Sequence, residues 1–317
     1  MLVVRPLWEL HSTLYLCVSN SKILMENTVE NNNSQNKDAE NWTMVIRPKR
    51  HLMDVNLQEI WHYRDLIKLF VRRDFVAKYK QTILGPLWFL IQPLFTTIMY
   101  TIVFGNIAKI STDGLPQILF YMSGIVGWTY FASCLNSTSN TFVANAGIFG
   151  KVYFPRLTLP ISIVISNLIQ FTIQFSLLLV FMLYFKLSGA DFHTNIYVLL
   201  LPVLIVLMAG LGLGFGIIIS SLTTKYRDLT NLVSFGVQLW MYATPIIYPL
   251  SEIPEKYRMF VLANPLTPII ETFRFALLGA GTVNWMHLTY SFVFTIFILS
   301  IGIILFNKVE QTFMDTV

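Results

Sequence analysis

The chain has 317 residues, of which 55% are hydrophobic and only 12% are charged, and its formal net charge at pH 7 is +5. Soluble domains carry about 25% charged residues, so this composition, with a mean hydropathy of +0.60, excludes a water-soluble fold, a coiled coil and a disordered chain. We interpret the net positive charge as basic residues placed relative to a bilayer, and expect no nucleic-acid partner. The two cysteines, Cys17 and Cys134, offer neither a disulfide framework nor a Cys-x-x-Cys metal motif.

The first 42 residues differ from the rest of the chain. Residues 26–40 are polar and rich in Asn, so they cannot offset the entropy cost of ordering, and we predict that residues 1–42 form a disordered extension. Residues 1–24 hold an apolar patch too short to span a membrane, without the residue order of a signal peptide. Our hypothesis is that Met25 is the physiological first residue and that residues 1–24 are upstream sequence or a dispensable tail.

Residues 43–80 are predicted to form a cytoplasmic amphipathic helix region at the membrane interface. Apolar residues recur near helical spacing between residues 55 and 80, with basic residues interleaved between them. Nine basic and four acidic residues lie between Arg47 and Lys80, which places the N-terminus in the cytoplasm by the positive-inside rule. Basic side chains at the end of this region are predicted to contact lipid headgroups, at about 1 kcal/mol each: Arg72, Arg73, Lys78 and Lys80.

Six charge-free runs follow, each longer than the roughly 20 residues that a transmembrane helix needs. They are residues 81–108, 114–150, 157–185, 192–224, 229–251 and 275–307. The fold class predicted is therefore an all-α integral membrane protein with six transmembrane helices in residues 81–313 and a cytoplasmic tail at 314–317. Loop charges alternate between balanced and basic, which places both termini in the cytoplasm.

The connection at residues 244–281 contains five prolines and is too apolar for a solvated loop. Broken apolar backbone at membrane depth is tolerated only where protein or an aqueous cavity covers it. We therefore predict two short re-entrant or interfacial helices on the outer side, the second stabilised by an ion pair between Glu271 and Arg274 at i,i+3 spacing. In the fourth run, glycines at four-residue spacing predict close helix packing: Gly210, Gly212, Gly214 and Gly216.

The sequence holds no GxxxxGK[ST] phosphate loop, so we expect no ATP hydrolysis by this chain alone. No charged residue interrupts the six runs, which disfavours an ion-coupled carrier. The five histidines are scattered, without metal-ligand spacing and without a nucleophile motif. We therefore predict no catalytic residue, no metal site and no cofactor in this chain.

Three segments on the predicted cytoplasmic side have distinctive sequences: RRDFVAKYKQTILGPLWFLIQPL at 72–94, NAGIFGKVYFPRLTLP at 145–160 and TTKYRDLTNL at 223–232. Together with ANP at 263–265 and ETFRFALLG at 271–279, and in this order, they resemble the membrane subunits of type-2 ABC exporters for polysaccharides, the O-antigen, capsule and teichoic-acid permeases. The resemblance covers about residues 46–313. It implies a homodimer of six-span subunits, paired with a separate ATPase subunit that binds ATP and Mg, which exports undecaprenyl-linked polysaccharide across the bacterial inner membrane.

The resemblance also implies site residues. Residues 151–156 correspond to a coupling helix that inserts into the ATPase, and an aromatic plug between two cations suits such a joint: Lys151, Val152, Tyr153, Phe154, Pro155 and Arg156. Tyr226, Arg227 and Asp228 form either a solvated turn or a second contact with the ATPase. The basic residues that end the interface region would add contacts to the lipid pyrophosphate. Aromatic rings offer sliding platforms to sugars, and three are predicted to line the channel: Trp88, Tyr121 and Trp128.

Other functions remain open on the sequence alone. A type-2 ABC exporter of a small lipid or drug has the same architecture. A membrane-embedded acyl- or glycosyltransferase would need an essential acid, base or histidine at the bilayer edge, for which His193, His287 and Asp228 are the candidates.

Overall fold

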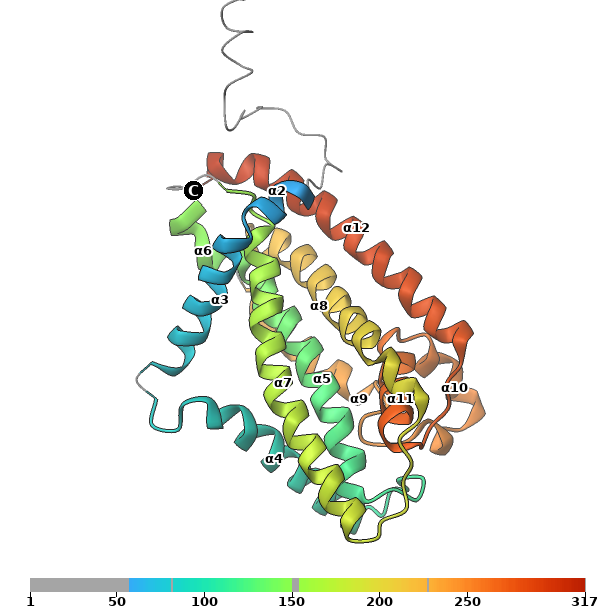
Figure 1. The fold of residues 1–317 in the computed structure, drawn as a ribbon. Helices are drawn as coiled ribbons and strands as arrows, with labels where there is room; N and C mark the ends of the chain where they lie inside the picture. Colours follow the sequence, from blue (N-terminus) through green and yellow to red (C-terminus); the bar gives the residue numbers. More distant parts are fainter. Residues whose placement is uncertain (1–56, 81, 150–153, 227, 317) are drawn as a thin grey trace, which may run out of the picture. The chain divides into compact units, whose positions relative to one another are not determined.

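The computed structural model describes residues 57–80, 82–149, 154–226 and 228–316 (Figure 1). Every regular element within these ranges is a helix, which confirms the all-α class. The predicted extension at residues 1–42, with the alternative start at Met25, lies outside the described residues.

The described chain begins with two helices, α2 (Leu57–His62) and α3 (Arg64–Tyr79). On α3 the Phe70 side chain is buried, whereas Leu69 and Val76 are 61% and 44% exposed. Basic side chains are exposed on the same helix. Helix α3 therefore has a buried anchor and an outward surface of apolar and basic groups, and its place at a membrane interface stays a prediction.

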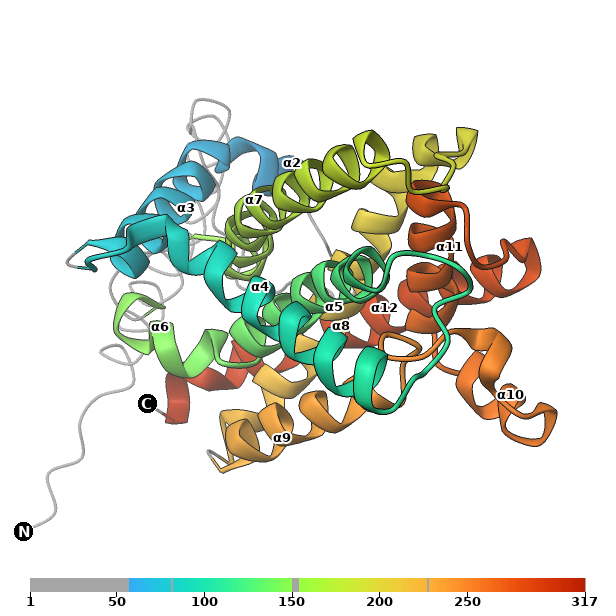
Figure 2. The ribbon, with the colours of Figure 1, turned by 90° about the horizontal axis from the view of Figure 1, so that it is seen from below.

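Helix α5 (Gln117–Ser139) is the centre of the bundle, as Figure 2 shows. Helices α4 (Trp88–Tyr100), α7 (Thr158–Leu187), α8 (Leu201–Thr223) and α11 (Leu266–Leu278) all contact it. Most of its side chains are buried, among them Leu119, Phe120 and Phe131. Helix α5 is the least apolar of the helical segments of spanning length and the most buried of them. Its central position therefore keeps polar side chains such as Ser123 and Thr138 against protein and away from lipid. Helix α12 (Trp285–Thr316) contacts α8.

The glycines of α8 allow it to contact a helix on each side. A Cβ atom added at Gly210 or Gly214 would lie 2.8 Å from a side-chain atom of Thr295 or Ile298 on α12. At Gly212 and Gly216 it would lie 2.7 Å and 2.6 Å from the Cβ atoms of Cys134 and Thr138 on α5. The predicted close packing is confirmed, and two alternating glycine pairs serve two different neighbours.

Five helical segments are long and apolar enough to cross a membrane. They are Gly85–Ile107, which joins η2 (Gly85–Leu87), α4 and η3 (Thr101–Ile107); Gln117–Ser139; Thr158–Leu187; Ile196–Thr223, which joins η4 (Ile196–Leu200) and α8; and Trp285–Val309.

The structure corrects the limits of two predicted runs. The second run forms a span only as far as Ser139, because the chain turns at Asn140 and continues as the separate helix α6 (Thr141–Phe149). The last span begins at Trp285 and not near Phe275. Gly279 ends α11 with a φ of 78° in the left-handed region, and Gly281 follows with a φ of 107°.

The fifth predicted run forms α9 (Leu229–Tyr242), which has 14 residues. At 1.5 Å per residue it is about 21 Å long, which is shorter than the roughly 30 Å hydrocarbon core of a bilayer. Five spans are thus found where six are predicted, and a sixth crossing by α9 and the turns that follow it stays a prediction.

Two short helices form in the proline-rich connection, as predicted: α10 (Glu255–Leu262) and α11, preceded by the turn η5 (Leu250–Glu252). Pro254 and Pro265 directly precede α10 and α11, where proline costs no helical hydrogen bond. Whether these helices are re-entrant stays a prediction.

The predicted ion pair between Glu271 and Arg274 is present and buried. Arg274 Nη1 donates to Glu271 Oε1 at 3.2 Å, and the two side chains are 2% and 5% exposed for Arg274 and Glu271. Arg274 Nη2 also donates to the carbonyl of Pro245 at 3.0 Å. The guanidinium carbon lies 3.8 Å from the centre of the Phe120 ring. Arg274 therefore joins α11 to α5 and to the turn after α9.

Candidate functional site

An aromatic cluster lies at the end of the bundle where α5 ends and α6 begins. It consists of Phe70 on α3, Phe142 and Phe149 on α6, Phe154 before α7 and Phe306 on α12, all of them buried. Ring centres are 5.7 Å apart for Phe70 and Phe154 and 5.9 Å for Phe154 and Phe149. They are 5.8 Å apart for Phe149 and Phe142 and 4.4 Å for Phe142 and Phe306. Such contacts stabilise by about 0.5–1.5 kcal/mol each beyond area burial, so the cluster joins three regions distant in sequence: α3, the stretch from α6 to the start of α7, and α12.

The predicted coupling segment leads into this cluster. Phe154 and Pro155 are buried, and the guanidinium carbon of Arg156 lies 5.4 Å from the centre of the Phe149 ring. Lys151, Val152 and Tyr153 lie outside the described residues. The described half of the segment is therefore an inward anchor, and Phe154 does not form part of an exposed aromatic plug.

Arg73 ties α3 to α6 beside the cluster. Its Nη2 lies 2.8 Å from Asp74 Oδ1 and donates to Asn145 Oδ1 at 3.5 Å, while its guanidinium carbon lies 4.8 Å from the centre of the Phe70 ring. The Asp74 carboxylate is therefore paired within its own helix. Arg73 therefore contacts side chains of both α3 and α6. Arg72, Lys78 and Lys80 are also exposed and can contact lipid headgroups.

The turn between α8 and α9 lies at the same end of the bundle. Thr223 Oγ1 donates to the carbonyl of Ser139 at 3.1 Å, and Thr230 Oγ1 donates to Asn140 Oδ1 at 3.1 Å. Tyr226 is 52% exposed and Asp228 is exposed, while Arg227 lies outside the described residues. The second predicted coupling segment therefore lies beside the corner between α5 and α6, whereas the first contacts the other end of α6 at Phe149.

The three rings predicted to line the channel have different surroundings. Trp88 is 51% exposed at the start of α4. Tyr121 and Trp128 are buried in the core of this chain, at 0% and 5% exposure, and their rings contact Phe120 and Phe131. Neither buried ring has a free face for a sugar in this structure, so their place in a channel stays a prediction that requires rearrangement.

Helices α4 and α9 expose polar side chains on otherwise apolar surfaces. Gln92 on α4 and Asn231 and Gln238 on α9 are exposed, and their amides have no hydrogen-bond partner among the described residues. Exposed apolar neighbours such as Phe95 and Phe235 surround them, at 63% and 59% exposure. An amide facing lipid would be unsatisfied, so this surface needs either a partner or water.

The described residues contain no group of three or more His, Cys, Asp or Glu side chains that could hold a metal ion. The features at this end are packing contacts and hydrogen bonds between helices, and the comparison with known proteins shows the family in which they occur. The ABC-2 type transporter family matches residues 65–278. The chain belongs to this family. It is a multi-pass membrane protein with five apolar helices of spanning length among the described residues.

Three relatives are similar to this chain over most of its length. The O-antigen export system permease protein RfbA of Klebsiella pneumoniae is 28% identical over 251 residues, which cover 79% of this chain and 94% of that protein. RfbA of Myxococcus xanthus is 28% identical over 69% of this chain and 82% of its own length. The polysialic acid transport protein KpsM of Escherichia coli is 25% identical over 77% of this chain and 93% of its own length. These relatives are thus O-antigen export permeases and a polysialic acid transport protein, which confirms the family resemblance found in the sequence.

Proposed function

We propose that this chain is the transmembrane subunit of an ATP-driven exporter that moves undecaprenyl-linked polysaccharide across the bacterial inner membrane. The observation that carries the proposal is its similarity to O-antigen and capsule permeases over more than nine-tenths of the length of RfbA from Klebsiella and of KpsM. ATP and Mg would be bound by a separate ATPase subunit, because this sequence has no phosphate loop.

The aromatic cluster end faces the cytoplasm in this proposal. The exposed basic residues of α3 lie at that end, and by the positive-inside rule they keep it, with both termini, on the cytoplasmic side. Helix α3 then lies along the membrane interface, with Arg72, Lys78 and Lys80 on headgroups or on the pyrophosphate of the lipid carrier. Helix α9 makes the sixth crossing, and α10 and α11 enter from the outer side.

Two copies form the channel in this proposal, with α4 and α9 at the joint. The exposed amides of Gln92, Asn231 and Gln238 support this, since in a single chain they would face lipid without partners. In a dimer they would hydrogen-bond across the interface or to water and glycan hydroxyls in the channel. Trp88, exposed at the start of α4, would offer its ring on the same side.

The coupling step follows from the aromatic cluster. The segment at residues 151–156 docks into the ATPase, with Tyr226, Arg227 and Asp228 as a second contact, and ATP binding pushes this end of the bundle. Phe154 passes the movement to Phe70 on α3, and Phe149 and Phe142 pass it to Phe306 on α12. Because close-packed rings transmit displacement and do not absorb it, α3, α6 and α12 move together. The subunit interface then changes, and the glycan advances without chemistry in this chain.

Co-purification in mild detergent tests the proposal. Wild type is expected to bring down an ATPase, and Tyr153→Ala is expected to lose it, because an aromatic anchor removed from an interface costs about 2 kcal/mol or more. Tyr257→Ala is the matched control, since Tyr257 is an exposed tyrosine on α10 that is 54% exposed at the other end of the bundle. If folded wild-type protein never carries an ATPase, the proposal fails and a membrane-embedded transferase becomes the better account.

A further inference from the structure

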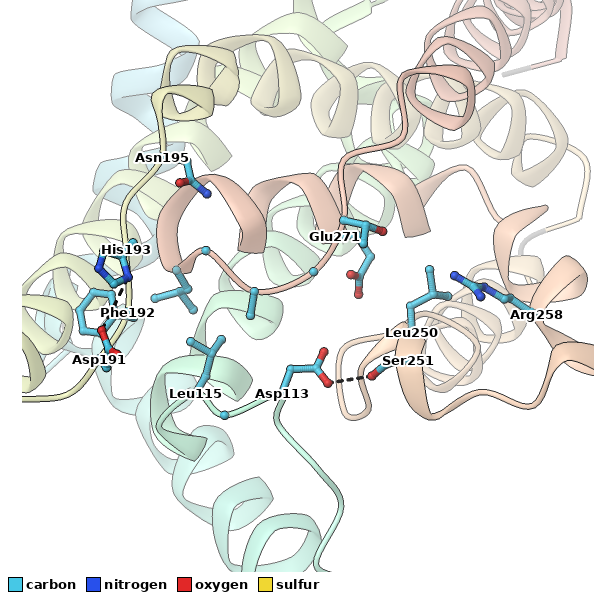
Figure 3. A pocket seen from close by; sticks show the side chains of 16 residues that line it. Asp113, Leu115, Asp191, Phe192, His193, Asn195, Leu250, Ser251, Arg258 and Glu271 are labelled. Atoms are coloured by element: carbon cyan, nitrogen blue, oxygen red, sulfur yellow. Dashed lines mark hydrogen bonds and ion pairs between the residues drawn. The ribbon is translucent and has the colours of Figure 1, made fainter.

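A polar cavity of about 610 Å³ lies at the end of the bundle opposite the aromatic cluster, where α5 begins (Figure 3). Its walls come from the connections before α5, between α7 and η4 and between α11 and α12, together with residues of η5, α10 and α11. Its volume lies within the range of about 300–1,000 Å³ typical of small-molecule sites. The coupling mechanism makes no use of this cavity.

Glu271 supplies the first polar group of the cavity. Its side chain is 5% exposed, and Oε1 accepts a hydrogen bond from Arg274. In Figure 3 the carboxylate points into the cavity on the side of Asp113. Its other oxygen, Oε2, has no donor among the described residues, and a Cβ atom added at Gly281 would lie only 2.9 Å from it. Glycine at 281 therefore leaves this acceptor oxygen open.

Asp113 supplies a second acceptor across the cavity. Its Oδ1 accepts from Ser251 Oγ at 2.7 Å, which fixes the carboxylate, and its backbone has a φ of 52°. Burial raises the pKa of Glu271; Arg274 opposes the rise, and the Asp113 carboxylate adds to it. The negative charge of Asp113 therefore disfavours the charged form of Glu271 across the cavity.

Arg258 supplies donors at the edge of the cavity. It is exposed, lines the cavity, and has no ion-pair partner among the described residues. Phe192, Leu115 and Leu250 add an apolar part of the wall. The cavity thus combines fixed acceptors, a forked donor and an apolar patch.

This combination suits a sugar ring better than an ion. Vicinal hydroxyls can donate to the two carboxylates and accept from the guanidinium, while the C–H face of the ring covers the apolar patch. An anionic ligand would meet the carboxylates of Asp113, Asp191 and Glu271. Asp191 faces His193 at 3.6 Å and Glu271 is paired with Arg274, which leaves Asp113, among the described residues, as the carboxylate without a cation beside it and Arg258 as the exposed cation. No group of three or more metal-ligating side chains is found in the described part of the chain, which argues against a divalent cation there.

We propose that this cavity binds one neutral sugar unit of the glycan as it leaves the exporter, an inference that rests on the proposed export of polysaccharide. Uncharged hexoses and N-acetylhexosamines fit, and uronic or sialic acids do not. The cavity holds the emerging chain by a single unit, which limits its return.

Saturation-transfer NMR on the full chain in lipid nanodiscs tests binding directly. The probes are the methyl glycosides of glucose, mannose, galactose and N-acetylglucosamine, and methyl glucuronoside is the charged counterpart of the glucose probe. At least one neutral probe is expected to bind, and Asp113→Asn and Arg258→Ala are each expected to weaken it about tenfold, as the loss of one good hydrogen-bonded contact does. Glu252→Gln is the control, because Glu252 is an exposed carboxylate in the same turn as Ser251 that does not line the cavity.

Three results would overturn the inference: no neutral glycoside binds the wild type, the two variants bind as well as wild type, or the glucuronoside binds more tightly than the glucoside. Should Asp113→Asn fail to fold, the exposed Arg258→Ala decides alone.

An export assay in cells adds a second arm, in which Arg258→Ala is expected to lower surface polysaccharide without releasing the ATPase. If Arg258→Ala loses sugar binding but export is unchanged, that result would contradict a role for the cavity in holding the glycan during export. An ATPase that co-purifies while no sugar binds would sink this inference and leave the proposed function standing.

Discussion

Among the described residues, Arg274 is the side chain whose burial is most costly to stabilise. A buried guanidinium is costly unless its charge and most of its N–H groups have partners. Here the two terminal nitrogens reach Glu271 and the carbonyl of Pro245, and the group lies over the face of Phe120, while Nε has no hydrogen-bond partner among the described residues. Gly124 makes room for it, since an added Cβ atom there would lie 3.1 Å from Arg274 Nη2. The residue therefore fixes helix α11 onto the central helix α5.

Replacing Arg274 by Met should destabilise the protein by about 3–5 kcal/mol, because Glu271 is left buried and unpaired. The double variant Glu271→Gln/Arg274→Met should recover part of that loss, since no buried charge remains. Thermal unfolding in detergent, followed by size-exclusion chromatography, measures both. The exposed Arg258→Ala is the control and should change little; an equal loss in Arg258→Ala and Arg274→Met would contradict the account.

At the scale of helices, the glycines of α8 decide how close its neighbours come. Gly212→Leu should separate α8 from α5 and lower stability by about 1–3 kcal/mol, because the added side chain meets Cys134 and the backbone of Phe131. Gly147→Ala is a matched control in helix α6, where an added Cβ atom meets nothing within 4 Å. That change should be neutral or slightly stabilising. The same melting assay compares them, and equal melting temperatures for the two variants would refute tight α5–α8 packing.

Charge-free runs predicted three of the spans to within a few residues, because a charge inside hydrocarbon is costly and so marks a boundary well. They could not show the corner at Asn140 or the early end of α9, since polar uncharged residues and prolines break helices without any charge. Composition also cannot tell which way a ring faces. For that reason Tyr121 and Trp128 were expected at a channel and are found in the core, whereas the role of Phe142 and Phe306 had no signal in the sequence.

At the scale of the whole molecule, α4 and α9 present the surface that one chain leaves incomplete. In a background with Cys17→Ser and Cys134→Ser, Gln238→Cys should cross-link two copies through a short bismaleimide. Leu183→Cys is the control, because Leu183 is 62% exposed on α7, away from the proposed interface. Cross-linking at residue 183 and none at residue 238 would place the subunit interface elsewhere.

Export itself is the central claim, and one measurement in cells tests it most directly. The gene is deleted in its own host, and surface polysaccharide and undecaprenyl-linked glycan are quantified with and without the wild-type chain supplied from a plasmid. Loss of the surface polymer, accumulation of the lipid-linked glycan inside the cell, and recovery of both with wild type are predicted. Unchanged surface polysaccharide and no internal lipid-linked glycan in the deletion strain would contradict the assignment.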